Sequence, residues 1–310
     1  MFPQNRDIKL GIVGLSIGNG HPYSWSAIFN GYDEYYMKNS PFPVIYDYLR
    51  QQDLPKNCIH GAKVTHIWCD KKEDAIQVSK ATFIPNIVDN LEDLIGRVDA
   101  VLLARDDAEN HLSMSLPFLK SGIPIFIDKP IAYDRKTAKS IFDAALTPNH
   151  IFTCSSLRFA QEFILTENDR AHIGKMGYIH AIVPKSWLKY SIHVIEPIYQ
   201  IIGFDKFQTG IKTSCNKIGN NVFIEFNESI TCSIQVVEKI NAPISITVCG
   251  ESGHKVLVFT DSFNAFKSSL LYFLDVLKGN VANIPVVETL KIVDIIEIGK
   301  QNKSINDENL

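Results

Sequence analysis

The stretch Gly122-Ile-Pro-Ile-Phe-Ile-Asp-Lys-Pro-Ile131 decides how this chain folds. Its apolar run over residues 123–127 predicts a short buried strand. The strand ends in Asp128 and Lys129, so an acid and a base stand at its carboxyl end. Open α/β sheets bind their ligands at that edge. Lys129 is therefore a charge that binds a ligand, a proton donor, or a solvated lysine at the end of a strand.

The composition predicts a globular protein of two domains. The chain has 310 residues, too many for one ordinary core, with 45% apolar and 21% charged residues. The net charge of −3 offers no basic surplus, which argues against a nucleic-acid partner. No apolar run approaches the ~20 residues that span a bilayer. The first residues lack the apolar core of a signal peptide, so we expect no membrane partner.

The cysteines indicate a reducing compartment. Six are scattered along the chain without a C-x-x-C pair. Cys69, Cys154, Cys232 and Cys249 stand in apolar, strand-like runs, which favours buried free thiols over disulfides or zinc. We therefore expect a cytoplasmic protein, and no cluster of residues has the spacing of a metal site.

A glycine-rich loop near the start of the chain is the second candidate feature. The β-rich run Ile8-Lys-Leu-Gly-Ile-Val-Gly14 continues directly into Leu15-Ser-Ile-Gly-Asn-Gly-His21. This context is typical of dinucleotide binding, because glycines let the backbone approach a pyrophosphate. The fingerprint G-x-G-x-x-G, counted from Gly14, would need glycine where Ser16 and Asn19 stand. A glycine-rich turn that binds no nucleotide is the alternative.

Asp70, at the end of a predicted strand over residues 63–70, is the candidate partner of the adenosine ribose hydroxyls. It lies 56 positions after Gly14, whereas the usual separation is about 20. An aromatic insertion over about residues 21–61 accounts for the excess. It forms a lid or pocket wall, or simply packs onto the domain. Lys71 could bind a 2′-phosphate and Asp70 would repel one, so the sequence favours NAD, with NADP possible.

Strands and helices alternate over residues 1–156. Further strands are expected near residue 87 and at 98–104, 123–127 and 150–155. The alternation predicts a Rossmann domain, a doubly wound parallel sheet whose strand ends share one edge. His111 stands at a helix start near this edge, where a structural role is as plausible as binding. The candidate cofactor-binding residues are Gly14, Ser16, Ile17, Gly18, Asn19, Asp70, Lys71, Ala104, Arg105, Asp106, His111, Asp128 and Lys129.

Residues 157–310 follow a different pattern. Six β-rich runs separated by turn clusters are expected at 178–183, 206–216, 221–226, 229–237, 243–249 and 255–259. Sequential strands with tight turns predict a mostly antiparallel sheet, so an α+β domain follows the α/β domain. We expect the ligand site in the cleft between the domains, which is a preferred location.

The ordered set of motifs resembles the glucose-fructose oxidoreductase/inositol dehydrogenase/MocA family. The glycine loop, Asp70, His111 and Asp128-Lys129-Pro130 stand in the family's order, although the family has glutamate where Asp128 stands. Ser155-Ser-Leu-Arg-Phe159, Ile173-Gly-Lys-Met-Gly177 and His193 continue the likeness. The resemblance implies an NAD(P)-dependent oxidoreductase that acts on a carbinol carbon of a sugar, inositol or related polyol. It also implies a homodimer or homotetramer.

Lys129 and His193 are the catalytic residues that the resemblance implies. A cation near the carbinol oxygen stabilises a developing alkoxide, and a neutral group accepts the hydroxyl proton. Lys129 suits the first task, and His193, which titrates near neutrality, suits the second. The family often has an aspartate four residues before the histidine, where this chain has Lys189. The candidate substrate-binding residues are Lys129, Arg158, Lys189, Tyr190, His193, His21, Tyr23 and Trp25.

Two other functions stay open. The imperfect glycine loop, Lys189 and the insertion also fit a catalytically silent NAD(P)-binding regulator or scaffold. A weaker alternative keeps the enzyme and makes the substrate an imine or a dihydrodiol. For single residues, His193 could be an ordinary helix histidine, Arg158 an ion-pair partner, and the aromatic residues part of the core.

Overall fold

The chain divides into two compact units in this computed structural model, which describes residues 6–147 and 149–300. Unit 1 comprises the chain up to Ala132 together with Lys136–Cys154 and Phe266–Val286. Unit 2 comprises Tyr133–Arg135, Ser155–Ala265 and the chain from Val287. The boundary expected after residue 156 lies beside the transition at residues 154–155. The return of residues 266–286 to unit 1 was not part of the sequence prediction.

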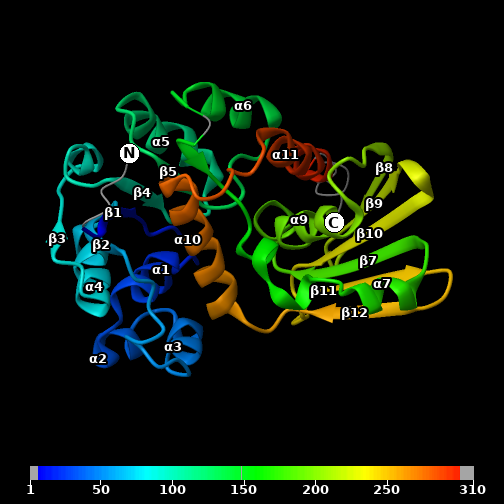
Figure 1. Cartoon of the computed structure of the whole chain (residues 1–310), viewed down its shortest axis with the longest axis horizontal. Helices are drawn as coiled ribbons and strands as arrows, with labels where there is room; N and C mark the ends of the chain where they lie inside the picture. The colour runs from blue at the N-terminus through cyan, green and yellow to red at the C-terminus, as the bar shows by residue number, and fades with distance from the viewer. Residues whose placement is uncertain (1–5, 148, 301–310) are drawn as a thin grey trace. The chain divides into compact units, whose positions relative to one another are not determined.

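Unit 1 contains a six-stranded parallel sheet (Figure 1). Its strands are β1 (Ile8–Val13), β2 (Ala62–Trp68), β3 (Asn86–Ile87), β4 (Ala100–Leu103), β5 (Ile125–Ile127) and β6 (Ile151–Phe152). The order β3-β2-β1-β4-β5-β6, with every neighbouring pair parallel, is that of a Rossmann sheet and confirms the predicted fold. Every side chain of β4 and β5 is buried, as expected of central parallel strands covered on both faces.

The helices of unit 1 follow the predicted alternation. They are α1 (His21–Asn30), α2 (Glu34–Lys38), α3 (Pro43–Leu49), α4 (Lys72–Thr82), α5 (His111–Lys120), α6 (Arg135–Asp143) and most of α10 (Ser262–Lys278), with short 3-10 turns at Leu91–Leu94 and Ala108–Asn110. Helices α1 and α4 pack against β2, and α5 packs against β4 and β5. Because α1 already belongs to the Rossmann pattern, the extra chain is the segment with α2 and α3.

Aromatic rings attach α10 to unit 1. The ring of Phe273 lies 5.5 Å from that of Phe126 on β5 and 5.6 Å from that of Phe152 on β6, measured between centroids. These contacts explain why residues far along the chain return to the first unit.

Unit 2 contains a second six-stranded sheet. Its strands are β7 (Met176–Pro184), β8 (Gln208–Cys215), β9 (Asn220–Phe226), β10 (Ile230–Val237), β11 (Ser245–Gly250) and β12 (His254–Val258), in the order β12-β11-β7-β10-β9-β8. Strand β7 lies between β10 and β11 and is parallel to β10, whereas the other pairs are antiparallel. The mostly antiparallel sheet is confirmed, with its first strand inserted in the middle.

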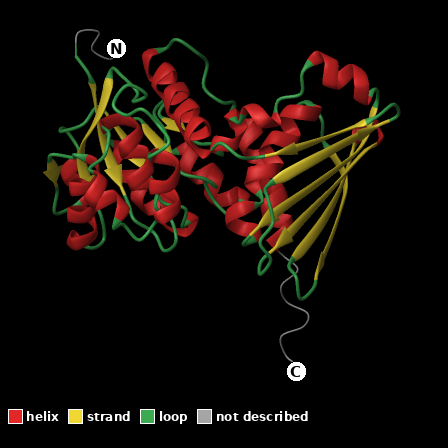
Figure 2. Cartoon of the chain, turned by 90° about the horizontal axis from the view of Figure 1, so that it is seen from below, coloured by secondary structure: helices red, strands yellow, loops and turns green. Residues whose placement is uncertain are grey.

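Most of the helical segments of unit 2 gather on one face of this sheet (Figure 2). The helices of this unit are α7 (Glu167–Ile173), α8 (Trp187–Tyr190), α9 (Ile192–Ile202) and α11 (Val286–Lys300), with 3-10 turns at Ser156–Phe159, Gln161–Phe163 and Asn227–Ser229. Helix α7 lies against β11 and β12 at the edge of the sheet. Ile195 and Ile198 of α9 share a core with Val222 and Ile224 of β9. Along β9 buried and outward side chains alternate, which is the pattern of a strand with one covered face.

The cysteines and the helix lengths bear on the expected cellular setting. All six cysteines are free thiols; Cys69, Cys154 and Cys232 are buried, whereas Cys249, which was expected to be buried, is half-buried. Burial raises the pKa of Cys69 to about 12, so its thiol stays protonated near neutrality. Among residues 6–147 and 149–300, no helix has the length and apolarity needed to cross a membrane.

Replacing Gly299 with alanine should destabilise unit 2. Gly299 lies on α11 where the indole of Trp187 packs and donates a hydrogen bond of 2.9 Å to the carbonyl oxygen of Ile296. A Cβ atom at Gly299 would lie 2.2 Å from Cε2 of Trp187. We expect a loss of about 1–3 kcal/mol in the free energy of unfolding, measured with urea. The matched control is Gly177→Ala on β7, where a Cβ meets nothing within 4 Å. Equal stability of the two variants would contradict this packing.

Candidate active site

The strand ends of unit 1 bring the predicted residues to one edge. Val13 of β1 pairs with Trp68 of β2 and with Leu103 of β4, and Leu103 pairs with Ile127 of β5. The residues that follow these strands therefore lie along the carboxyl edge of the parallel sheet. This carboxyl edge carries the glycine loop, Asp70, the segment that begins at Ala104, and Asp128 with Lys129.

The loop from Gly14 to Gly20 is a tight turn between β1 and α1. The N–H of Asn19 donates to the carbonyl oxygen of Ser16 over 3.1 Å, and Gly18 has φ +78°, which only glycine adopts readily. A Cβ at Gly20 would lie 2.6 Å from the ring of Phe42. The N–H groups of His21, Tyr23 and Ser24 at the start of helix α1 already donate to protein oxygens, and Pro22 has none. The positive dipole end of α1, directly after the loop, still suits an anion. The loop therefore fits a pyrophosphate although it departs from the glycine fingerprint.

Ser16 ties the glycine loop to Asp106, which follows β4. The Ser16 hydroxyl donates to Oδ1 of Asp106 over 2.9 Å, and the Asp106 N–H donates to Oγ of Ser16 over 3.3 Å. Oδ2 of Asp106 lies 4.0 Å from Nζ of Lys129, and the two residues are 6% and 4% exposed. Lys129 is therefore a buried residue paired with a carboxylate, and it is not a solvated lysine.

Asn19 and His21 make the corresponding link to Asp128, which follows β5. Oδ2 of Asp128 accepts a hydrogen bond of 3.0 Å from Nδ2 of Asn19 and lies 2.5 Å from Nδ1 of His21. Oδ1 accepts the N–H of Lys129 over 2.8 Å. The two residues that break the fingerprint, Ser16 and Asn19, thus each bind one of the acids that flank Lys129.

Arg105 orients the predicted ribose partner, Asp70. Its guanidinium donates to both carboxylate oxygens of Asp107, at 2.9 and 2.6 Å, and to Oδ2 of Asp70 at 2.5 Å. Burial alone lowers the pKa of Arg105, but these two carboxylates outweigh it and raise the pKa. Burial likewise raises the pKa of Asp107, yet the bonds from Arg105 and Asn110 hold it below the usual value. The side chain of Asp70 is 52% exposed, so it stays accessible to a ribose.

Four other predicted residues of unit 1 take different places. His111 is fully buried, with Nδ1 3.0 Å from the carbonyl oxygen of Ile131 and Nε2 2.8 Å from that of Arg105, so it joins the loops after β4 and β5. Tyr23 and Trp25 are each 2% exposed and belong to the core, not to a pocket mouth as expected. Ile17 is 97% exposed on the glycine loop.

His193, on α9 of unit 2, is the centre of a second polar cluster. Its Nδ1 lies 2.8 Å from the Ser155 hydroxyl, and the ring of Tyr190 meets its ring edge-on at 5.2 Å between centroids. The Ser155 N–H donates to Glu196 over 2.6 Å. Lys185 lies 4.4 Å above the ring of Tyr190 and bonds its hydroxyl. The structure thus brings Tyr190 and His193 into contact, and their role in a substrate site stays a prediction.

Arg158 has two carboxylate partners in the same unit. Its guanidinium donates to Glu196 over 3.0 Å and to Glu288 over 2.7 Å. Burial alone lowers the pKa of Arg158, and the two carboxylates outweigh it and raise the pKa. Arg158 therefore makes ion pairs, the alternative kept open for it. Lys189 lies half-buried on α8.

Sequence reasoning missed Ser155 and Glu196 as site residues. A signal for Glu196 was present, because it is the one acid in the apolar helix Ile192–Ile202 and lies three positions after His193. His193 and Glu196 face the same side of the helix at that spacing. The joint action of Lys129 in unit 1 and His193 in unit 2 stays a prediction.

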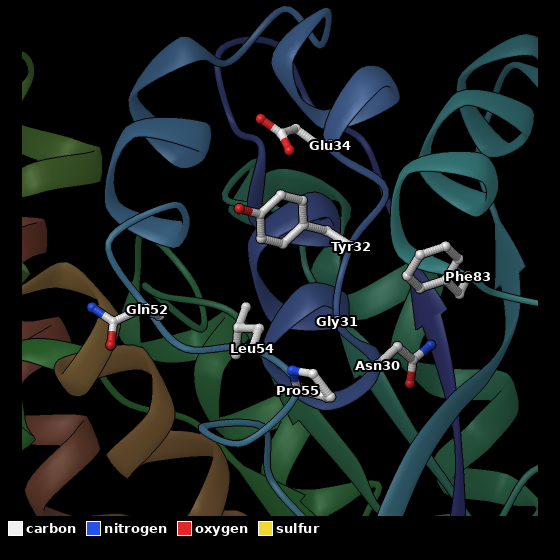
Figure 3. Close-up of a pocket in the computed structure, with 8 residues that line it drawn as sticks. All are labelled: Asn30, Gly31, Tyr32, Glu34, Gln52, Leu54, Pro55 and Phe83. Carbon is white, nitrogen blue, oxygen red and sulfur yellow. The ribbon is translucent and has the colours of Figure 1, made fainter.

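A pocket of about 380 Å³ in unit 1 lies outside this candidate site (Figure 3). Its lining residues are Asn30, Gly31, Tyr32, Glu34, Gln52, Leu54, Pro55 and Phe83. The pocket lies at the carboxyl end of α1, about 15 Å along the helix from the glycine loop at the rise of ~1.5 Å per residue. None of the predicted site residues lines it. In the described part of the chain, no three of the His, Cys, Asp and Glu side chains gather as metal ligands.

The sheet order and the polar residues at its carboxyl edge are those of a dinucleotide-binding Rossmann domain. Residues 8–155 match the family model described as "Oxidoreductase family, NAD-binding Rossmann fold". These residues belong to the glucose-fructose oxidoreductase/inositol dehydrogenase/MocA family. The match confirms the resemblance and the NAD(P) cofactor, while the choice between NAD and NADP stays a prediction. No curated protein matches this sequence.

Solved structures share the fold over nearly the whole chain. Scyllo-inositol dehydrogenase from Lactobacillus casei has 13% identity and a TM-score of 0.72, covering 95% of this chain and 96% of that one. Myo-inositol 2-dehydrogenase from Lactobacillus plantarum has 13% identity and a TM-score of 0.72, covering 96% and 97%. Biliverdin reductase from Synechocystis, in complex with biliverdin and NADP+, has 11% identity and a TM-score of 0.70, covering 95% and 98%. At these identities the likeness shows the fold alone.

Proposed function

We propose that this protein transfers a hydride between the nicotinamide of NAD(P) and a carbinol or carbonyl carbon of a sugar, an inositol or a related polyol. The proposal rests on the buried position of Lys129 at the end of a central strand. Lys129 is 4% exposed, directly follows β5, and lies within 4.0 Å of the acid that the glycine loop binds. The shared fold with two inositol dehydrogenases supports the substrate class.

The two polar clusters supply the groups that this reaction needs. A bound nicotinamide supplies the hydride acceptor. Lys129 places a cation where the substrate oxygen gains negative charge, which is the kind of preorganised stabilisation that lowers a barrier most. His193, in the polar cluster of unit 2, supplies a hydrogen-bonding group for the substrate, the role that the family resemblance implies. The glycine loop and Asp70 bind the pyrophosphate and the adenosine ribose of the cofactor.

A substrate panel tests the function directly. Inositols, sugars, keto-sugars, dihydrodiols and imines are each offered with oxidised or reduced cofactor, and nicotinamide absorbance is followed. We expect robust turnover of at least one polyol or sugar. Cofactor binding with no turnover across the panel would contradict the proposal and favour a silent regulator or scaffold. Consumption of reduced cofactor by imines alone would change the substrate class.

We expect Asp70 to determine the preference for NAD over NADP. Its carboxylate would repel a 2′-phosphate, and its removal frees the guanidinium of Arg105 beside Lys71. We expect Asp70→Ser to raise the ratio of kcat/KM for NADP over NAD by roughly tenfold or more, because like charges brought together cost several kcal/mol. The matched control is Asp89→Asn, which removes an exposed carboxylate paired with Lys72 at 2.6 Å. An unchanged ratio in Asp70→Ser would refute NAD selection by this residue.

The outward face of the sheet in unit 2 supports a homo-oligomer. The strand registers place Tyr178, Phe223, Val256 and Val258 on one face, and each is at least 40% exposed. Exposed apolar side chains spread over one face of a sheet favour a partner surface, and we propose a second copy of this chain. The free thiols fit our proposal of a cytoplasmic location.

A charge on this face should dissociate the oligomer. We expect the 34.9 kDa chain to have the mass of a dimer or tetramer by light scattering. Phe223→Glu should lower that mass, because burying an unpaired carboxylate in an interface is costly. Phe83→Glu, an exposed aromatic residue of unit 1, is the matched control and should leave the mass unchanged. A monomeric wild-type chain would contradict the proposal.

A further inference from the structure

The hydroxyl of Ser155 has a hydrogen-bond pattern that fixes its proton. Ser155 is fully buried, so its hydroxyl is expected to donate to some acceptor. Its Oγ accepts the N–H of Leu157 over 3.1 Å. Within the described ranges, the other polar atom in hydrogen-bond contact with Oγ is Nδ1 of His193, at 2.8 Å. Since the Leu157 N–H is itself a donor, the hydroxyl proton points to Nδ1.

This pattern determines which nitrogen of His193 carries the proton. A neutral imidazole has one donor nitrogen and one acceptor nitrogen. Because Nδ1 accepts the Ser155 hydroxyl, the proton of neutral His193 lies on Nε2. An imidazolium would place a proton on Nδ1 and leave the buried hydroxyl without an acceptor. Ser155 therefore opposes both the other tautomer and the charged form.

We propose that Ser155 holds His193 as the Nε2-protonated, neutral tautomer, so that Nε2 donates a hydrogen bond to the oxygen of a bound substrate and the proton of His193 is not transferred. This inference rests on the proposed function. It also revises the expectation that His193 accepts the proton. Ser155 is a positioning residue, because it acts on the substrate through His193.

This assignment accounts for the proton of the reaction. In the direction of carbonyl reduction, the carbonyl carbon would gain a hydride from the reduced cofactor and the oxygen would gain a proton. Because neutral His193 keeps its proton on Nε2 and only donates a hydrogen bond, that proton comes from another acid, and the ammonium group of Lys129 is the candidate. A neutral histidine serving as a hydrogen-bond donor to a carbonyl is an established catalytic arrangement.

Nitrogen NMR tests the tautomer without any substrate. The chain is labelled with ¹⁵N, and the ring nitrogens of His193 are assigned by comparison with His193→Gln. We expect an N–H signal on Nε2 and none on Nδ1 near neutral pH. A proton on Nδ1, or an imidazolium with both, would overturn the proposal. Ser155→Ala should weaken the preference for Nε2 and Ser155→Thr should keep it. If either variant fails to fold, the wild-type spectrum alone still shows which ring nitrogen of His193 carries the proton.

Kinetics tests the role of the Nε2 proton. The side-chain amide of glutamine donates a hydrogen bond but transfers no proton. We expect His193→Ala to lower kcat by about 100-fold, the usual loss for one such donor, and His193→Gln to lower it by less than about 10-fold. Equal loss in both variants would show acid–base catalysis by His193 and overturn the proposal. A chain with the expected tautomer but no turnover would refute the proposed function and leave the role of Ser155 standing.

Discussion

Lys129→Ala is expected to lower kcat by roughly 100- to 10,000-fold, the range of a general acid–base contribution, while the protein still binds NAD. Lys129 follows β5 at the edge where the ligand of an open α/β sheet binds. Its Nζ lies 4.0 Å from Asp106. Alanine removes both the proton and the positive charge that the substrate oxygen needs. The glycine loop and Asp70, to which we assign cofactor binding, stay in place.

The loss must be separated from misfolding and from simple loss of charge. Lys129→Met keeps the buried volume, and Lys129→Arg keeps the charge but holds its proton too firmly to transfer it. We expect both to be nearly as inactive as alanine. Lys139→Ala, which removes a lysine with a side chain 65% exposed, is the matched control and should keep full activity. Cofactor affinity is measured by calorimetry and folding by thermal melting.

One outcome would remove Lys129 from the mechanism. If Lys129→Ala turns over the best substrate at the wild-type rate, the residue is a structural partner of Asp106 and no more. If cofactor binding is lost together with turnover, the lysine supports the nucleotide site, and the chemistry belongs to another group.

The strand patterns predicted most of the fold. Strands alternating with helices over residues 1–156 indicated a parallel sheet. Successive β-rich runs separated by tight turns indicated a mostly antiparallel second sheet. Periodicity does not reveal pairing, so the insertion of β7 between β10 and β11 was not foreseen. The return of α10 to unit 1 rests on ring contacts of Phe273 with β5 and β6, which depend on tertiary structure.

The site was predictable where topology alone places residues. Parallel strands bring their carboxyl ends together, so Asp70, Arg105, Asp106 and Lys129 could be grouped from the sequence. Their hydrogen-bond partners could not, because these depend on side-chain directions. Ser16 and Asn19 counted as defects in the glycine fingerprint, yet the structure bonds them to Asp106 and Asp128.

Glu196→Ala is expected to cost unit 2 about 3–5 kcal/mol in its free energy of unfolding, the usual loss when one partner of a buried ion pair is removed. Glu196 is 1% exposed and accepts hydrogen bonds from Arg158 at 3.0 Å and from the Ser155 N–H at 2.6 Å. Alanine leaves Arg158 with Glu288 alone and leaves a buried N–H without its acceptor. Urea unfolding followed by circular dichroism measures the loss.

Matched variants distinguish two roles of Glu196: its ion pair with Arg158 and its hydrogen bond to the Ser155 N–H. Glu288→Ala removes the other carboxylate of Arg158 without touching Ser155, so we expect a smaller loss of stability and little change in turnover. Glu196→Ala should also lower turnover, because Ser155 positions His193. In a double-mutant cycle with Arg158→Met, the two losses should fall short of additivity, since each variant removes the same pair. Full additivity, or a loss in Glu196→Ala below about 0.5 kcal/mol, the range of ordinary surface substitutions, would show that this pair does not stabilise the support of His193.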